Sequence, residues 1–234
     1  MPIRLVAFDM DGTLVDALSS WGWVHDHFQD SNDVGLQQFL RGEIDDEEFI
    51  CSDIRIWRRH RPELTTDELG AILDGVPLMP GAAALMGKLK SRGVRTAIIS
   101  GGIDLLAERV ARELGMDEAS ANGFTTDAAR RLTGTGIVRV PIQEKERVLA
   151  AMQERLGIGP EATAAVGNSD IDVGLFRRAR IRVAFLPADA RVRSQATHII
   201  EEKDLTRLLP ILLPDGHDRD GPFAPAGADL RQRF

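Results

Sequence analysis

The chain has 234 residues, 43% of them hydrophobic and 28% charged, and its 29 basic and 36 acidic side chains give a net charge of −7. This length predicts one or two domains with a sizeable core, and the absence of a basic block argues against a general binder of nucleic acid or acidic membranes. The single cysteine, Cys51, excludes an internal disulfide and a zinc site built from cysteines. No run of about 18 apolar residues occurs and the first residues do not resemble a secretory signal, so we expect a cytoplasmic protein without membrane or nucleic-acid partners.

Short apolar runs alternate with helical patterns along most of the chain. The predicted strands cover residues 3–8, 94–99, 163–166, 181–186 and 197–200. The predicted helices cover residues 81–91, 103–114, 143–156 and 171–178, with a short one near 205–209. This alternation is typical of an α/β fold, a doubly wound parallel sheet with helices on both faces.

Residues 16–77 interrupt the alternation because they show helical periodicity and no convincing strand. Ile50, Ile54 and Trp57, for example, share one helix face. We therefore expect a core domain of residues 1–15 and 78–213 with an inserted helical cap of residues 16–77. Residues 122–140 are less regular and are compatible with a hairpin, and residues 214–234, rich in Gly, Pro, Ala and Asp, predict a flexible tail.

Asp9-Met10-Asp11-Gly12-Thr13 follows the first predicted strand. Ligands bind outside the carboxyl ends of strands in such sheets, and two acids one residue apart suit a nucleophile and an acid/base group around a hard metal ion. An ordinary acidic turn is the alternative, since Asp-Gly is common in turns.

Three further segments fall where this sheet would bring them together with the first. Ser100-Gly101-Gly102 follows the second strand and is expected to open a helix, where a hydroxyl and free amides suit an anionic oxygen. Lys145 lies near the start of a helix, where the macrodipole disfavours a cation. Its presence there suggests that it binds an anion such as a phosphate. The segment 167–172, Gly-Asn-Ser-Asp-Ile-Asp, supplies oxygen ligands after the third strand. Each of these three could also be an ordinary turn or surface residue, but together with the motif that begins at Asp9 they favour a single site.

In this order the four motifs resemble those of the haloacid dehalogenase superfamily, and the chain is most similar to its phosphoserine phosphatase-like branch. The resemblance runs from Ile3 to about Leu209 and includes Arg41-Gly42-Glu43-Ile44 and Met79-Pro80-Gly81. It implies a Rossmann-like core with an inserted helical cap of the C1 type, and a small phosphorylated metabolite as partner.

The resemblance also implies a role for each motif. Asp9 would attack phosphorus, and Asp11 would serve as general acid and then as general base. Ser100 and the Gly101 amide would hold phosphate oxygens, with Lys145 offsetting negative charge. Mg²⁺ would bind Asp9, the Asp11 carbonyl and the acidic turn at Asn168 and Asp172.

Two departures from the branch pattern affect the expected substrate and metal. Asn168 stands where the branch usually has an aspartate on the metal, so we expect weaker Mg²⁺ binding. Leu18 and Asp53 align with the cap Glu and Arg that hold the amine and carboxylate of phosphoserine, and Asp53 is expected to repel a substrate carboxylate. We therefore expect a Mg²⁺-dependent phosphatase acting on a small monoester. The alternatives are a phosphoserine phosphatase, a sugar phosphomutase, or a phosphate-binding regulatory protein with impaired catalysis.

Overall fold

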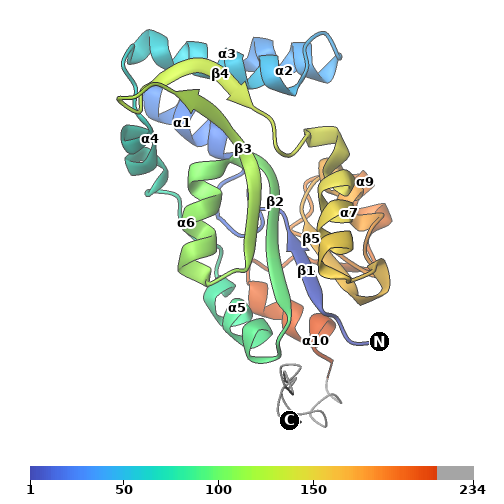
Figure 1. Ribbon diagram of the computed structural model, residues 1–234. Coiled ribbons are helices and arrows are strands. Elements are labelled where there is room, and N and C mark those ends of the chain that lie inside the picture. Colours follow the sequence, from blue (N-terminus) through green and yellow to red (C-terminus); the bar gives the residue numbers. More distant parts are fainter. Residues whose placement is uncertain (215–234) are drawn as a thin grey trace, which may run out of the picture.

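The computed structural model describes residues 1–214 and is built around a seven-stranded sheet (Figure 1). The strand order is β4-β3-β2-β1-β5-β6-β7, and all neighbours are parallel except β3 and β4. The strands are β1 Leu5–Phe8, β2 Arg95–Ile103, β3 Glu118–Thr126, β4 Leu132–Ile137, β5 Thr163–Gly167, β6 Ile181–Phe185 and β7 His198–Ile200. Each strand predicted from the sequence is present, and the α/β class is confirmed.

Helices cover both faces of the sheet. Those of the core are α5 Ala82–Ser91, α6 Asp104–Leu114, α7 Lys145–Leu156, α8 Val173–Phe176, α9 Ala190–Gln195 and α10 Leu209–Leu212. Short 3₁₀ turns lie at η1 Ile142–Glu144, η2 Pro160–Ala162, η3 Asp170–Asp172 and η4 Leu205–Leu208. In Figure 1, α5 and α6 lie on one side of the strands, and α7 and α9 on the other.

The strand side chains divide between two hydrophobic clusters because successive residues of a strand point to opposite faces. In β1, Val6 and Phe8 join the cluster that contains α5 and α6, whereas Leu5 and Ala7 join the cluster that contains α7. All four are buried. Burial on both sides explains why β1 is a continuous apolar run instead of an alternating one.

Four helices lie between β1 and α5, within the span predicted as a cap: α1 Ser20–Phe28, α2 Asp33–Leu40, α3 Asp46–His60 and α4 Thr66–Leu73. Their starts carry side-chain caps, as the sequence chemistry predicts. Asp45 caps α3 by accepting from the Glu48 amide, and Thr65 and Glu68 form a capping box on α4. The limits of the core and cap domains stay a prediction.

The segment 122–140 contains a hairpin, as the sequence suggested, made by β3 and β4. Its outer strand β4 packs along the cap helix α3 (Figure 1). At Gly136 the approach is close, because a Cβ there would lie 2.8 Å from the Ile50 Cβ. The hairpin therefore joins the edge of the core sheet to the cap.

Asp9 and Asn168 follow two adjacent strands at the centre of the sheet. The chain leaves β1 toward β2 on one side and leaves β5 toward β6 on the other, so the direction of winding reverses between these two adjacent strands. Ligands in open α/β sheets bind at such a reversal, outside the carboxyl ends of the strands. Asp9 follows β1 directly and Asn168 follows β5 directly, so the candidate motifs lie at this crevice.

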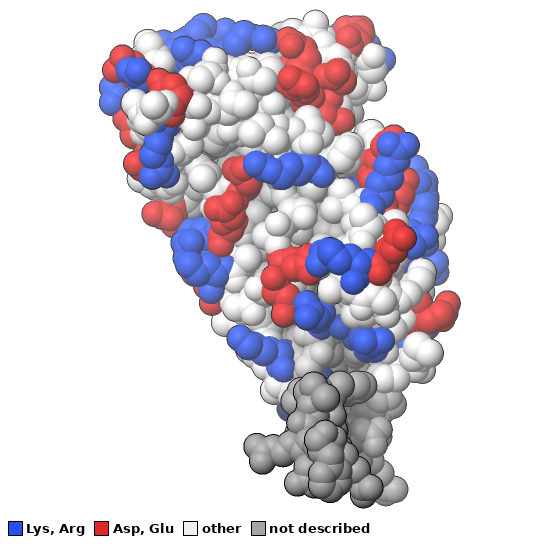
Figure 2. Space-filling model, viewed as in Figure 1, with Lys and Arg blue, Asp and Glu red and all other residues white. Residues whose placement is uncertain are grey.

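Charges of both signs are interleaved over the face of the molecule seen in Figure 2. Many charged side chains of the described residues form exposed ion pairs, such as Arg41 with Glu43 and Arg61 with Glu68. In residues 1–214 no helix is long and apolar enough to span a membrane. The predicted flexible tail lies outside the described residues, apart from Pro214.

Candidate active site

Asp9 and Asp11 lie on the loop that follows β1, where Asp9 is buried and Asp11 is partly buried. Asp9 continues the ladder with β5, since its amide donates to the Val166 carbonyl at 2.9 Å. Gly12 then turns the chain with φ +70°, a conformation that favours glycine. A Cβ at Gly12 would also collide with the Asn168 side chain, so the loop after β1 and the turn after β5 are in direct contact.

Lys145 is the first residue of α7 and its side chain is completely buried between two carboxylates. Its Nζ lies 2.8 Å from Asp9 Oδ1 and 2.7 Å from Asp172 Oδ1. These two carboxylates explain why a cation is tolerated at a helix N-terminus against the macrodipole. Burial lowers the pKa of Lys145, but Asp172 and Asp9 outweigh that effect and hold the pKa above its ordinary range, so the side chain is an ammonium.

Asp11 is oriented by Ser20, the first residue of the cap helix α1. Asp11 Oδ2 accepts from the Ser20 amide at 2.9 Å and from the Ser20 hydroxyl at 2.8 Å. The other oxygen, Oδ1, is buried and has no hydrogen-bond partner. Burial raises the pKa of Asp11, against the opposing effect of the bonds from Ser20. A carboxyl group with a raised pKa retains its proton more readily, which suits a general acid.

Ser100 and Gly101 lie inside β2, which extends to Ile103, and α6 begins only at Asp104. The expectation that this triplet opens a helix is therefore wrong, because β2 continues to pair with β3 as far as Ile103 and Asn122. Ser100 is buried, and its Oγ accepts from the Gly102 amide at 3.1 Å. The hydroxyl proton is left free to reach an anionic oxygen.

Asp172 closes the turn after β5 with both of its carboxylate oxygens. Oδ1 accepts from Lys145, and Oδ2 accepts from the amides of Asn168 at 2.9 Å and Ser169 at 3.1 Å. This engagement favours a positioning role for Asp172 over the predicted role as a metal ligand. The Asp170 side chain does not join this turn: it is half exposed, and its Oδ2 lies 3.5 Å from Arg191 Nη1.

Two buried carboxylates, those of Asp9 and Asp172, therefore contact a single ammonium group, and Asp11 adds a further acid to the site. Burial, followed by the Asp172 carboxylate, raises the pKa of Asp9 to about 7 against the opposing effect of Lys145. The excess of negative charge and the unpartnered Asp11 Oδ1 fit a nearby cation. In the described part of the chain no three His, Cys, Asp or Glu side chains gather as a metal cluster. A Mg²⁺ site here would instead combine Asp9, the Asp11 carbonyl and the Asn168 amide, all oxygen donors of the kind Mg²⁺ prefers.

The cap positions Leu18 and Asp53 differ in their environments. Leu18 is 87% exposed and its Cδ2 lies near Gly12, at the edge of the site. Asp53 is buried inside the cap, where its Oδ1 lies 2.8 Å from His25 Nε2 and 2.7 Å from Asn32 Nδ2. The expectation that Asp53 repels a substrate carboxylate is therefore wrong, because the sequence could not reveal that His25 and Asn32 engage it inside the cap.

Two further residues hold the site: Ser20, which sequence reasoning missed, and Trp21. Ser20 links Asp11 to β2, since its hydroxyl also accepts from the Ile103 amide at 3.0 Å. The indole N–H of Trp21 donates to the Gly101 carbonyl at 3.0 Å. The pair Ser19-Ser20 at the start of a predicted helix indicates a helix N-cap, but nothing in the sequence indicates that Ser20 faces Asp11.

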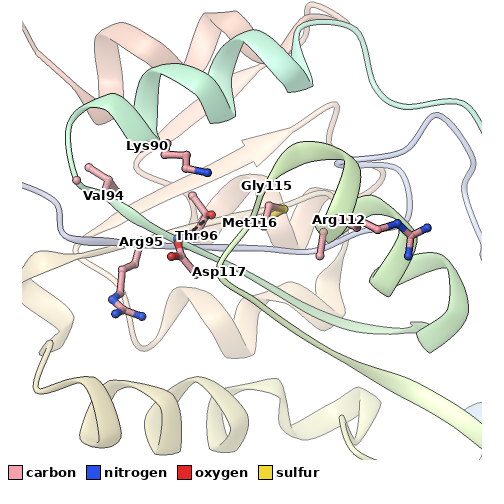
Figure 3. Close-up of a pocket in the computed structure, with 10 residues that line it drawn as sticks. Lys90, Val94, Arg95, Thr96, Arg112, Gly115, Met116 and Asp117 are labelled. Atoms are coloured by element: carbon pink, nitrogen blue, oxygen red, sulfur yellow. Dashed lines mark hydrogen bonds between the residues drawn. The ribbon is translucent and has the colours of Figure 1, made fainter.

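A surface hollow lies at the opposite end of the sheet, where β2 begins and α6 ends (Figure 3). Lys90, Arg95, Arg112 and Asp117 are among the side chains that line it. Figure 3 shows the Arg95 and Arg112 side chains pointing away from each other. The hollow is remote from Asp9 because β2 is parallel to β1, whose carboxyl end carries the acids. It is not part of the candidate active site.

Comparison with known proteins agrees with the fold and with the family that the motifs suggest. Residues 6–177 match the family of haloacid dehalogenase-like hydrolases. The phosphoserine phosphatase of Polaromonas sp. is 32% identical over 223 residues, which cover 89% of each chain. That of Archaeoglobus fulgidus is 30% identical over 216 residues, and the match covers 89% of this chain but only 60% of the relative. A phosphoserine phosphatase structure with an analogue of the phospho-aspartyl intermediate superposes with a TM-score of 0.76 at 24% identity, covering 91% of this chain and 100% of the other.

The chain belongs to the haloacid dehalogenase-like hydrolase family. Within that family it is a phosphatase of the phosphoserine phosphatase-like branch.

Proposed function

We propose that this protein hydrolyses a small phosphate monoester in two steps through a phosphoaspartate on Asp9, with Mg²⁺ as cofactor. The observation that carries the proposal is the buried arrangement of Asp9, Lys145 and Asp172 beside the unpartnered oxygen of Asp11. A nucleophilic carboxylate must be held in one orientation and its charge must be offset before a phosphoryl dianion can approach. Lys145 does both for Asp9.

In the first step a carboxylate oxygen of Asp9 attacks phosphorus, and the bond from phosphorus to the ester oxygen breaks. Oδ1 is held by Lys145 at 2.8 Å, and Oδ2 accepts no hydrogen bond from the described residues, so it is the oxygen free to attack. Asp11 gives its proton to the departing alcohol oxygen. Its raised pKa, caused by burial, keeps that proton available.

In the second step Asp11, now a carboxylate, takes a proton from a water molecule whose oxygen attacks phosphorus. The bond from phosphorus to Asp9 breaks and inorganic phosphate is released, with Asp9 and Asp11 restored. Ser20 keeps Asp11 in one orientation through both steps because it holds Oδ2 with two hydrogen bonds. Asp11 therefore acts in turn as acid and as base through a single oxygen, Oδ1, which has no other hydrogen-bond partner.

Charge on the phosphoryl group is offset from two sides. The Ser100 hydroxyl and the Gly101 amide bind phosphoryl oxygens, and Lys145 lies behind Asp9. Mg²⁺, held by Asp9, the Asp11 carbonyl and the Asn168 amide, would supply a positive charge that neutralises the phosphoryl oxygens as the bond order at phosphorus changes. Most of the catalysis is then positioning and electrostatic stabilisation.

The names of the relatives support phosphoserine as the first substrate to test. The cap positions argue against it as the preferred one, since the exposed Leu18 offers no partner to an amine, and Asp53, engaged by His25 and Asn32 inside the cap, offers no cation to a carboxylate. We infer a small monoester whose alcohol portion lacks the paired amine and carboxylate of serine.

A metabolite screen with Mg²⁺ and the variant Asp9→Asn tests the reaction. The wild type is expected to release phosphate from several small monoesters, and Asp9→Asn to release none while remaining folded by circular dichroism. An amide is a poor nucleophile of nearly the same shape as the carboxylate, so the loss is chemical. Residual turnover by Asp9→Asn on any accepted substrate would show that Asp9 is not the nucleophile.

A further inference from the structure

Trp21 belongs to the cap, but its indole N–H contacts the core strand that carries Ser100 and Gly101. We propose that Trp21 is a positioning residue for phosphate binding: it fixes the peptide between Gly101 and Gly102, and that peptide orients the Ser100 hydroxyl. The inference rests on the proposed function, because that function assigns Ser100 to the phosphate.

The peptide between Gly101 and Gly102 is held at both ends. Its carbonyl accepts from Trp21 Nε1 at 3.0 Å, and its N–H donates to Ser100 Oγ at 3.1 Å. A serine hydroxyl has one hydrogen to donate and two lone pairs that accept. Because the Gly102 N–H occupies a lone pair, the rotation of this peptide determines the direction in which the Ser100 proton points.

This peptide lies where the pairing of β2 with β3 is irregular, so a side-chain hydrogen bond helps to hold it. The register between β2 and β3 shifts between Ile99 and Ile103, on either side of the two glycines. Glycine also has wide backbone freedom, so consecutive glycines let a peptide plane rotate easily. Asn122 Nδ2 is a second donor to the Gly101 carbonyl, but it lies 3.4 Å away and has a better partner in the Val140 carbonyl at 3.0 Å. Trp21 makes the shorter bond.

Trp21 is itself held firmly by aromatic neighbours. Its ring stacks on Trp57 with centroids 5.5 Å apart and planes at 16°, and it meets Phe124 edge-on at 6.4 Å. Such contacts keep an indole in one orientation. The preceding residue, Ser20, is bonded to Asp11, so the first turn of α1 is fixed against both sides of the active site.

The decisive comparison is between Trp21→Phe and the matched control Trp23→Phe. Trp23 lies in the same helix, is also partly buried, and its indole donates to the Ile72 carbonyl at 3.1 Å, within the cap. Each variant loses one indole bond to a main-chain carbonyl, but only the first bond touches the phosphate-binding strand. The readouts are kcat and KM for p-nitrophenyl phosphate, and the Kd of inorganic phosphate measured by calorimetry with Mg²⁺.

We expect Trp21→Phe to raise both KM and the phosphate Kd by about 3- to 10-fold, the effect of one neutral hydrogen bond, with kcat changed by less than about twofold. Trp23→Phe should leave KM and Kd unchanged. The proposal is overturned if the two variants give the same Kd, or if Trp21→Phe lowers kcat with KM unchanged, which is the signature of a smaller folded fraction. It is also overturned if the wild type does not bind phosphate.

Failure of the proposed function would look different, since the wild type would bind phosphate but turn over no monoester. In that case the Kd difference still tests Trp21. If Trp21→Phe does not fold, the wild-type indole N–H signals serve instead. The Trp21 signal is identified by elimination from Trp23→Phe and Trp57→Phe, and inorganic phosphate should shift it more than the Trp23 signal. An equal or smaller shift contradicts the proposal.

Discussion

Asp172 and Asp170 are two residues apart in one turn, but their environments are opposite. Asp172 is fully buried and bridges Lys145 to the turn, whereas Asp170 forms an exposed pair with Arg191. Removing one partner of a buried ion pair typically costs about 3–5 kcal/mol, and an exposed pair contributes about 0–1 kcal/mol.

Asp172→Ala should therefore reduce both activity and stability far more than Asp170→Ala. Without Asp172, Lys145 loses the contact that holds it beside Asp9, and the amides of Asn168 and Ser169 lose their acceptor. The measurements are kcat/KM at saturating Mg²⁺ and the free energy of unfolding in urea. Equal losses in the two variants would show that the bridge through Asp172 does not position the nucleophile.

Asn168 brings a neutral amide to the predicted metal site, where it lies against the loop of Asp9 and Asp11. Asn168→Asp should lower the half-saturating Mg²⁺ concentration, because a carboxylate attracts a divalent cation more strongly than an amide does. It should also increase the rise in Tm on adding Mg²⁺, since a third acid beside Asp9 and Asp11 repels them until a cation binds.

The control for this prediction is Asp170→Asn, which changes a charge in the same turn without facing the site. It should leave the half-saturating Mg²⁺ concentration unaltered. An unchanged or higher value for Asn168→Asp would mean that Asn168 is not a metal ligand.

Among the structural elements, the β3–β4 hairpin most directly links the core and the cap. Its outer strand approaches α3 so closely that a Cβ at Gly136 would lie 2.8 Å from Ile50 Cβ and 3.2 Å from the Glu47 carbonyl oxygen. Gly136→Ala should therefore lower the free energy of unfolding by about 1–3 kcal/mol through overpacking. Urea unfolding measures this.

Gly70, in cap helix α4, is the matched control, since nothing lies within 4 Å of a Cβ placed there. Gly70→Ala should raise stability by up to about 1 kcal/mol because alanine favours the helix. If Gly136→Ala is also stabilising, the hairpin does not pack on α3 as tightly as the structure shows.

At the scale of the whole molecule, we propose that the cap selects the leaving group that reaches the site. Phosphoserine should be a poor substrate, because Leu18 is apolar and Asp53 already pairs with His25 inside the cap. The missing partners for an amine and a carboxylate should cost at least about 1 kcal/mol each, so kcat/KM for phosphoserine should lie well below that of the best monoester. A panel of phosphorylated metabolites measures the ranking. If phosphoserine ranks first, the leaving group is recognised by residues other than those at positions 18 and 53.

Much of this fold could be predicted from local sequence patterns. The buried strands are continuous apolar runs, and the helices of the core show 3.6-residue periodicity, because burial on both faces of a sheet or on one face of a helix leaves a direct imprint on the sequence. The order of the motifs around Asp9, Ser100, Lys145 and Asn168 was sufficient to indicate the family, since the carboxyl ends of parallel strands meet at one edge.

The partners of each polar side chain were decided only by the tertiary structure. The sequence suggested that a phosphate explains the position of Lys145 at a helix N-terminus, but the folded chain places the Lys145 side chain between Asp9 and Asp172. Likewise, Asp53 is engaged by His25 and Asn32, and Trp21 reaches Gly101 from 80 residues away along the chain. Hydrogen bonds act over about 3 Å and depend on direction, so a sequence that specifies which residues are buried does not specify which of them meet.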